Sequence, residues 1–283
     1  MLVYAPARLH AGRPLVVVLH GCRQDAASFA VDGGWIALAD QFRLALLIPE
    51  QTNENHVGRC FNWYQPEDVR RGRGEVMSIR QMIRSAVARY GSDPRRIFVA
   101  GFSAGGAMTA ALLAAYPAVF AAGGVVAGMP VGSAKSSMMA LLQSQRAEYS
   151  SRTRMTLAGY VRAATRSLTR TKWPRVSIWQ GTRDRTVAPG NAEALAAQWS
   201  GLHGCEPGPT SDNMVGPGVR RRAWGRLDRP PRVELWTIAN LGHGFPIDPR
   251  TPESGHVGPW VVDAGLCAAQ LMAAFWGLER TTK

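Results

Sequence analysis

Residues 97–134 contain no charged side chain, and this stretch limits what the chain can fold into more than any other part of the sequence. A membrane span of this length would be continuously apolar, whereas here Pro117, several glycines and small polar residues interrupt the apolar ones. A segment that is apolar on all sides is typical of a buried strand, a buried helix and a second strand in succession. We therefore expect residues 97–134 to form the centre of a parallel sheet and no membrane span.

Short apolar runs rich in Val, Ile and Leu alternate along the chain with segments of helical spacing. The predicted strands are residues 15–19, 44–48, 97–100, 125–127, 176–179 and 233–238, and the predicted helices lie within residues 35–42, 76–87, 108–115, 191–199 and 264–276. This alternation predicts an α/β fold with a mainly parallel sheet and helices on both faces. We expect a single domain over residues 1–283, with a partly helical cap at about 132–171 and a surface excursion at about 204–231.

The net charge of +13 comes almost entirely from arginine, because only three of the 33 basic residues are lysines. Such a charge permits binding to nucleic acid or to anionic lipid. The arginines are nevertheless scattered, with dense clusters only at residues 70–73 and 220–229, and no nucleic-acid motif lies among them. We therefore expect no nucleic-acid partner, and the sequence does not indicate an oligomeric state.

The motif Gly101-x-Ser103-x-Gly105 stands directly between a predicted strand and a predicted helix. A serine on a sharp turn between these elements needs small neighbours, because the strained backbone brings adjacent chain segments close together. Gly101, Ala104 and Gly105 supply them. The context predicts a nucleophile elbow that carries Ser103, although the bare motif also occurs in ordinary glycine-rich turns.

A serine nucleophile needs a base, and the base needs an acid that fixes its tautomer. Asp184 lies in a turn after one predicted strand, where open sheets place their sites, and His243 lies between two glycines after a later strand. The order serine, aspartate, histidine is that of α/β hydrolases. We predict Ser103, Asp184 and His243 as a catalytic triad, with Asp248 as a weaker candidate for the acid.

The loop at residues 19–22 follows the first strong strand, from which α/β hydrolases provide one donor of the oxyanion hole. We predict that the backbone N–H groups of Cys22 and Ala104 are the two donors. His20 is expected to brace this loop by hydrogen bonding and not to act as a base.

Three aromatic residues lie near the proposed catalytic loops in the sequence: Trp63, Tyr64 and Phe245. We predict that they line an apolar acyl groove, with core packing as the alternative for each. No cofactor and no metal are expected, because a serine, a histidine and an aspartate supply all the groups that this chemistry needs.

The chain contains four cysteines, Cys22, Cys60, Cys205 and Cys267. They are too few for a disulfide-dense scaffold and too scattered for a CxxC metal site. Two arrangements stay open for the first two cysteines: a zinc site shared with His20 and His56, whose intervals differ from those of zinc fingers, or a disulfide. We expect Cys205 and Cys267 to be unpaired.

Several segments carry a family resemblance: residues 14–24, 49–51, 60–64, 74–82, 101–108, 181–187, 242–246, 258–260 and 275–278. Through them the chain resembles, nearly end to end, the catalytic domain of the extracellular polyhydroxyalkanoate (poly-3-hydroxybutyrate) depolymerase family of esterases. The resemblance implies an α/β-hydrolase fold, the triad Ser103, Asp184 and His243, the Cys22 loop at the oxyanion hole and a Cys22–Cys60 disulfide.

Three functions are consistent with these features. The main hypothesis is a serine esterase that hydrolyses short-chain 3-hydroxyalkanoate esters through an acyl-enzyme on Ser103. A carbohydrate esterase that removes feruloyl or acetyl groups is the alternative, because related hydrolases use the same catalytic parts. A non-catalytic protein that binds anions with the same fold is a second alternative.

The compartment follows from the resemblance and not from the sequence itself. The first ten residues lack a basic region followed by an apolar region, so the chain as given predicts no signal peptide. The resemblance implies a secreted or periplasmic protein, and a cytoplasmic location stays open.

Overall fold

The computed structural model describes residues 1–147, 149, 154–165 and 172–278, and a nine-stranded sheet runs through the centre of this part of the chain. Its strands are β1 Leu2–Tyr4, β2 Leu15–Leu19, β3 Ala45–Ile48, β4 Ile97–Phe102, β5 Ala122–Val126, β6 Arg175–Gly181, β7 Ser211–Gly216, β8 Val219–Trp224 and β9 Val233–Ile238. The strand order is β1-β3-β2-β4-β5-β6-β9-β8-β7. Neighbours from β3 to β9 are parallel, whereas β1, β8 and β7 join the two edges antiparallel.

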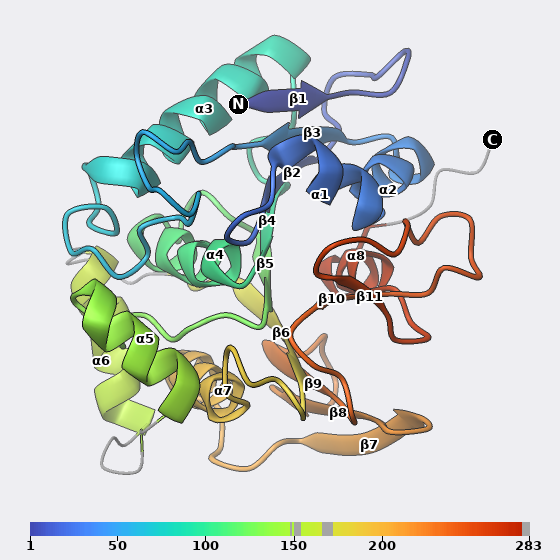
Figure 1. Ribbon diagram of the computed structural model, residues 1–283. Helices are drawn as coiled ribbons and strands as arrows, with labels where there is room; N and C mark the ends of the chain where they lie inside the picture. The colour runs from blue at the N-terminus through green and yellow to red at the C-terminus, as the bar shows by residue number, and fades with distance from the viewer. Residues whose placement is uncertain (148, 150–153, 166–171, 279–283) are drawn as a thin grey trace.

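Helices cover both faces of this sheet, as Figure 1 shows with the sheet seen almost edge-on. They are α1 Ala26–Asp32, α2 Trp35–Phe42, α3 Gly74–Tyr90, α4 Ala104–Ala115, α5 Ser137–Arg146, α6 Arg154–Thr165, α7 Gly190–Leu202 and α8 Ala268–Trp276. Because strand side chains alternate, Leu15, Val17 and Leu19 of β2 belong to the core cluster that includes residues of α3, α4, α6 and α7, whereas Val16 and Val18 belong to the cluster that includes residues of α1, α2 and α8. The predicted mainly parallel sheet with helices on both faces is confirmed.

The uncharged stretch forms β4, α4 and β5 at the centre of the molecule. Every residue of α4 is buried, and the helix contains only small and apolar side chains apart from Thr109. No described helix has both the length and the apolar character needed to cross a membrane. The stretch is therefore a core strand, a core helix and a second core strand.

The segment expected to be a surface excursion, residues 204–231, instead contains two strands of the main sheet. β7 and β8 form a hairpin, and β8 pairs antiparallel with β9 from Val219↔Ile238 to Trp224↔Val233. Val219, Ala223 and Trp224 are buried, whereas β7 at the sheet edge is largely exposed. This corrects the expectation of a surface excursion. The strand β8 was missed because its three consecutive arginines hide its apolar face in the sequence.

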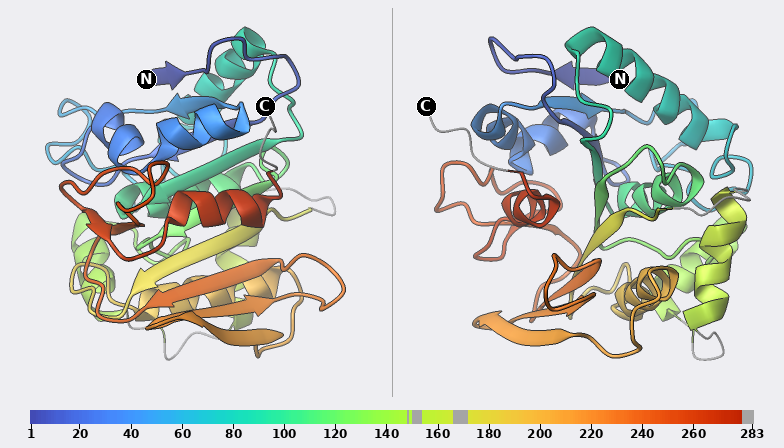
Figure 2. Two further views of the ribbon diagram at one scale, coloured as in Figure 1. Left: turned by 90° about the vertical axis from the view of Figure 1, so that its right-hand side faces the viewer. Right: turned by 180° about the vertical axis from the view of Figure 1, so that it is seen from behind.

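The segment expected to form a cap contains α5 and α6, while its residues 148, 150–153 and 166–171 lie outside the described residues. α6 packs against α4 and α7 on their side away from the sheet (Figure 2), and Leu157, Ala158 and Val161 are buried in this contact. α5 buries only Ala140. Its C-terminal turn is joined to the loop before α7 by a 2.7 Å hydrogen bond from Ala188 N to Ser144 O.

Candidate active site

Ser103 lies on a sharp turn between β4 and α4, and its backbone adopts φ 56° and ψ −119°. Left-handed φ values are strained for any residue other than glycine. The neighbours must be small: a methyl group on Gly101 would lie 2.3 Å from the Gly105 carbonyl oxygen, and one on Gly105 would lie 2.3 Å from the Leu19 carbonyl oxygen. The glycines of the motif thus allow the turn and the loop after β2 to approach each other.

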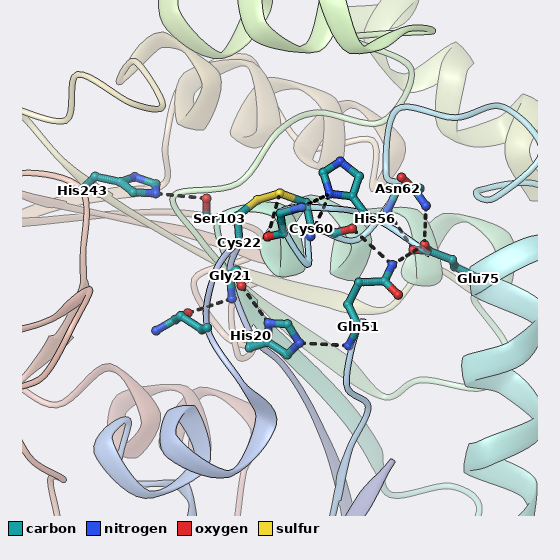
Figure 3. The surroundings of a disulfide bond; sticks show 12 residues. His20, Gly21, Cys22, Gln51, His56, Cys60, Asn62, Glu75, Ser103 and His243 are labelled. Atoms are coloured by element: carbon teal, nitrogen blue, oxygen red, sulfur yellow. Dashed lines mark hydrogen bonds between the residues drawn. A yellow bond between two sulfur atoms is a disulfide. The ribbon is translucent and has the colours of Figure 1, made fainter. Parts of the chain in front are cut away.

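The three residues predicted as a triad lie in one hydrogen-bonded row at the carboxyl ends of β4, β6 and β9. His243 Nε2 is 3.0 Å from Ser103 Oγ, and His243 Nδ1 is 2.8 Å from Asp184 Oδ2. Figure 3 shows the imidazole directed at the serine hydroxyl. Because a carboxylate only accepts, Nδ1 carries the proton, which leaves Nε2 free to accept the proton of the serine.

The Asp184 carboxylate is fully buried, and neutral donors hold both of its oxygens. Oδ1 accepts from the backbone N–H groups of Thr186 at 2.9 Å and Val187 at 2.8 Å, and Oδ2 also accepts from Gln180 Nε2 at 3.0 Å. Gln180 was not predicted, although a polar residue in the buried strand β6 was a signal that could have identified it. Asp248, the weaker candidate for the acid, instead forms an ion pair with Arg250 at 2.7 Å, whereas Asp184 is the carboxylate bonded to His243.

Of the two residues predicted to provide oxyanion donors, Ala104 directly follows the serine, and Cys22 lies in the loop after β2. Ala104 is the first residue of α4, so its N–H has no partner within the helix and lies at the positive end of the helix dipole. The loop that carries Cys22 packs on the same helix end, since a methyl group on Gly105 would lie 2.4 Å from the His20 carbonyl oxygen.

Cys22 and Cys60 form a disulfide, which joins the proposed oxyanion loop to the loop that precedes α3. The zinc alternative is wrong because the two sulfur atoms are bonded to each other and cannot act as thiolate ligands. The imidazole of His56 accepts from the backbone of Gly58 and Cys60 instead. Cys205 and Cys267 are unpaired, and Cys267 is buried.

Of the three aromatic residues predicted to line an acyl groove, Trp63 and Tyr64 lie together, and Phe245 lies apart from them in the core. Trp63 is half-buried and packs on Val187 in the turn that carries the acid, and its ring meets Tyr64 edge-on at 5.6 Å. Tyr64 packs on Ala140 of α5. Phe245 is fully buried, with its ring 5.3 Å from that of Phe29, so it packs in the core and offers no surface to a substrate.

Two further aromatic residues contact the proposed base. The Phe102 ring lies 4.8 Å from the His243 ring, and the Trp260 ring lies 6.0 Å from it and is 44% exposed. An exposed tryptophan beside a catalytic histidine is a candidate substrate contact. No spacing in the sequence links Trp260 to His243, because a separate loop carries Trp260.

Comparison with known proteins gives a family and two kinds of esterase. Residues 2–211 match the family model described as esterase PHB depolymerase. The chain is 34% identical over 98% of its length to poly(3-hydroxyalkanoate) depolymerase C of Paucimonas lemoignei, of which it spans 66%. It is 29% identical over 80% of its length to feruloyl esterase B of Thermothelomyces thermophilus, of which it covers 77%.

A solved structure extends the likeness over nearly the whole chain. The acetyl xylan esterase from Aspergillus awamori superposes with a TM-score of 0.81 at 21% identity, covering 98% of this chain and 93% of that one. At this level of identity the comparison establishes the fold, that of an α/β hydrolase.

Proposed function

The chain belongs to the esterase PHB depolymerase family, and from this premise we propose that it is a serine esterase that hydrolyses short-chain 3-hydroxyalkanoate esters, as oligomers or amorphous polymer. The observation that carries the proposal is the hydrogen-bonded row from Asp184 through His243 to Ser103. We propose Ser103 as nucleophile, His243 as base and Asp184 as acid, within one catalytic domain.

Acylation begins when Ser103 Oγ attacks the ester carbonyl carbon while His243 Nε2 takes the hydroxyl proton. The Asp184 carboxylate stabilises the imidazolium that forms. The carbonyl oxygen becomes an oxyanion, which the N–H groups of Cys22 and Ala104 stabilise. The tetrahedral intermediate then collapses: the bond to the alkoxy oxygen breaks, His243 gives its proton to that oxygen, and the alcohol leaves.

Deacylation repeats these steps with water as nucleophile. His243 takes a proton from the water, the resulting hydroxide attacks the acyl carbon, and the bond to Ser103 Oγ breaks as the proton returns to the serine. The products are a 3-hydroxy acid and the regenerated enzyme. Protein groups and water supply every proton that moves.

The aromatic side chains around the serine suit an apolar, uncharged acyl chain. Trp63 lies on the side of the acid turn, and the exposed Trp260 lies beside His243. We propose these two indole rings as opposite walls of the acyl site, with Tyr64 supporting the first. An apolar wall is compatible with a butyrate-sized ester and excludes strongly hydrated groups.

A carbohydrate esterase is the second candidate, because the feruloyl esterase and the acetyl xylan esterase resemble this chain over most of its length. The same three residues would perform either reaction, and only the acyl and alcohol sites would differ. Acyl preference therefore distinguishes the two functions.

We also propose that the protein works in an oxidising compartment, outside the cell or in the periplasm. The support is the Cys22–Cys60 disulfide, a bond that persists where thiols are not kept reduced.

The test compares the wild-type protein with Ser103→Ala, first on p-nitrophenyl butyrate and then on 3-hydroxybutyrate oligomers, feruloyl esters and acetylated xylan. We expect wild-type hydrolysis of the butyrate ester and of the oligomers, and loss of both in the variant. A fluorophosphonate probe should label Ser103, as located by mass mapping. Preference for feruloyl or acetyl substrates would favour the second candidate, and undiminished hydrolysis by Ser103→Ala would refute the mechanism.

A further inference from the structure

Glu75, in the first turn of α3, has its carboxylate buried among four amide donors (Figure 3). Oε1 accepts from Gln51 Nε2 at 2.5 Å, Asn55 Nδ2 at 2.9 Å and Asn62 Nδ2 at 2.8 Å, and Oε2 accepts from the Asn62 backbone N–H at 2.8 Å. An acidic residue in the first turn of a helix ordinarily faces water, where it interacts with the helix dipole. Here the carboxylate instead joins α3 to three residues of the loop between β3 and α3.

One route from this carboxylate leads to the proposed oxyanion donor. Gln51, which Glu75 holds, donates its backbone N–H to His20 Nε2 at 3.1 Å, and His20 Nδ1 donates to the Gly21 carbonyl oxygen at 2.7 Å. In a planar trans peptide, the carbonyl and the following N–H point in opposite directions. The bond from His20 to the Gly21 oxygen therefore also sets the direction of the Cys22 N–H.

The other routes lead to the loop that the disulfide joins to the Cys22 loop. Gln51 Nε2 also donates to the Cys60 carbonyl oxygen at 3.2 Å, and Cys60 is bonded to Cys22. Glu75 accepts both from the backbone and from the side chain of Asn62, whose neighbour Trp63 packs near the acid turn. Both ends of the disulfide and one proposed wall of the acyl site are thus linked to one carboxylate.

We propose that Glu75 is a positioning residue for ester hydrolysis: its ionised carboxylate orients the oxyanion N–H of Cys22 through Gln51 and His20, and fixes the Cys60–Trp63 loop. The inference rests on the proposed function, because an oxyanion donor has a role only in acyl transfer. Glu75 does not touch the substrate and acts through these partners alone.

The ionised form is required because all four partners are N–H donors. A protonated carboxyl would direct its hydrogen at one of these donors and would lose an acceptor site. Burial raises the pKa of Glu75 to about 7; hydrogen bonds from Asn62 and Gln51 oppose the rise, and the Asp68 carboxylate adds to it. The arrangement is therefore sensitive to pH near neutrality.

Titratable groups surround Glu75 on several elements. Asp68 lies in the loop before α3, and Glu50, which comes after β3, lines the same cavity of about 400 Å³ as Asp68 and Glu75. Tyr64 lies in the same loop as Asp68, four residues after Cys60. Beyond Gln51 lies His20, and burial lowers the pKa of this imidazole, which keeps it neutral as the route requires. Burial and Asp68 oppose ionisation of Glu75, so its ionised form depends on the four donors.

The test is Glu75→Gln, which keeps the shape of the side chain but turns an NH₂ group toward N–H donors. At pH 8 we expect kcat per titrated active site to fall about tenfold to hundredfold, short of the loss on deleting an oxyanion donor, with KM changed less than about threefold. Affinity for butaneboronic acid, which forms a tetrahedral adduct on the serine, should fall by the same factor. The ratio of wild-type to variant kcat should approach one at pH 5.5, because protonation of Glu75 has the same effect as the substitution.

Asp68→Asn is the matched control, because Asp68 accepts from the Glu75 backbone N–H but has no link to the Cys22 loop. We expect its kcat to stay within about twofold of wild type. If Glu75→Gln lowers only the melting temperature, or if the kcat ratio is constant from pH 5.5 to 8.5, the residue is structural and the proposal is wrong. A wild-type protein without esterase activity would instead refute the proposed function.

Glu75→Asp retains the charge and replaces the first variant in the test if Glu75→Gln does not fold. Its kcat should lie below that of the wild type but above the value expected after loss of an oxyanion donor. The wild-type protein also provides a test without substitution. Amide hydrogen exchange of residues 20–24, corrected for its intrinsic pH dependence, should be at least about threefold faster at pH 6 than at pH 8. Equal corrected rates would overturn the proposal.

Discussion

Removal of the disulfide is expected to weaken both the fold and the catalysis, and the first effect can be calculated from loop length. Cys22 and Cys60 are separated by 38 residues, and closing a loop of that length removes about 13 cal/mol/K of entropy from the unfolded chain. At 25 °C this corresponds to about 4 kcal/mol of unfolding free energy. For a chain of 283 residues, 4 kcal/mol corresponds to a fall of about 7 °C in melting temperature.

The effect on catalysis should be smaller, because the Cys22 loop keeps other contacts when the disulfide is absent. Arg23 N donates to the Gly58 carbonyl oxygen at 2.9 Å, and His20 still holds the Gly21 carbonyl. We therefore expect kcat to fall only about threefold to tenfold, well below the hundredfold or greater loss of an oxyanion donor.

The assay compares urea and thermal unfolding of the wild type with those of the double variant Cys22→Ser, Cys60→Ser, and measures kcat on p-nitrophenyl butyrate. Cys205→Ser is the control, because this unpaired cysteine is far from the loop in the chain; its effect should be about 1 kcal/mol or less. The reasoning fails if the double variant and the reduced wild type both unfold within 1 kcal/mol of the oxidised wild type, since that would mean that the disulfide does not restrict the unfolded chain.

Three further predictions concern Ser103, Asp184 and Glu75. Ser103→Ala and Ser103→Gly should both be inactive, but the glycine variant should be about 1 kcal/mol more stable in urea unfolding, because φ 56° strains alanine and not glycine; equal stabilities would show that the turn is unstrained. Asp184→Asn should lower kcat about 10³- to 10⁴-fold, whereas Asp248→Asn should leave it within about twofold, and similar losses in both would reopen the choice of acid. The raised pKa of Glu75 means that its contribution to stability is fully present below pH 4.5 and is lost as the pH rises through about 7, by up to about 3 kcal/mol. Glu75→Gln should therefore remove this fall in the free energy of unfolding between pH 4.5 and 8, and an unchanged fall would assign it to another group.

The central strands were predictable because burial on both faces leaves a continuous apolar run in the sequence. All five residues of β2, Leu15–Leu19, are fully buried, and the strand has no polar position that would obscure it. The proposed catalytic residues were predictable for a related reason. In a parallel sheet the strands end at a common edge, so chemically active residues that directly follow different strands converge even when they are distant in the chain.

The edges of the sheet could not be predicted in the same way. β8 reads Val-Arg-Arg-Arg-Ala-Trp, and the exposed Arg220 pairs with Asp212, which only the folded hairpin brings near. Phe245 shows the opposite failure. Its position two residues after His243 predicts a place in the site, but β10, Phe245–Ile247, is buried at all three positions, and the Phe245 ring packs in the core against Phe29.

The surroundings of Glu75 could not be predicted because the donors are spread over residues 51–62 of a loop without regular structure, and nothing in the spacing of Gln51, Asn55 and Asn62 indicates a common acceptor. Their convergence follows from the disulfide, which returns the loop after β3 to the loop after β2, and from α3, which begins where that loop ends. A buried carboxylate without a cation is costly, as is a serine at positive φ. Both costs occur within the loops around one nucleophile, while the strands beneath contain only apolar side chains at their buried positions in β2 and β3. This distribution indicates that the apolar core of the sheet supplies the stability of the fold. The loops at its carboxyl edge are less stable because they orient the proposed nucleophile, the Ser103 hydroxyl, and the proposed oxyanion donor, the Cys22 N–H, for acyl transfer.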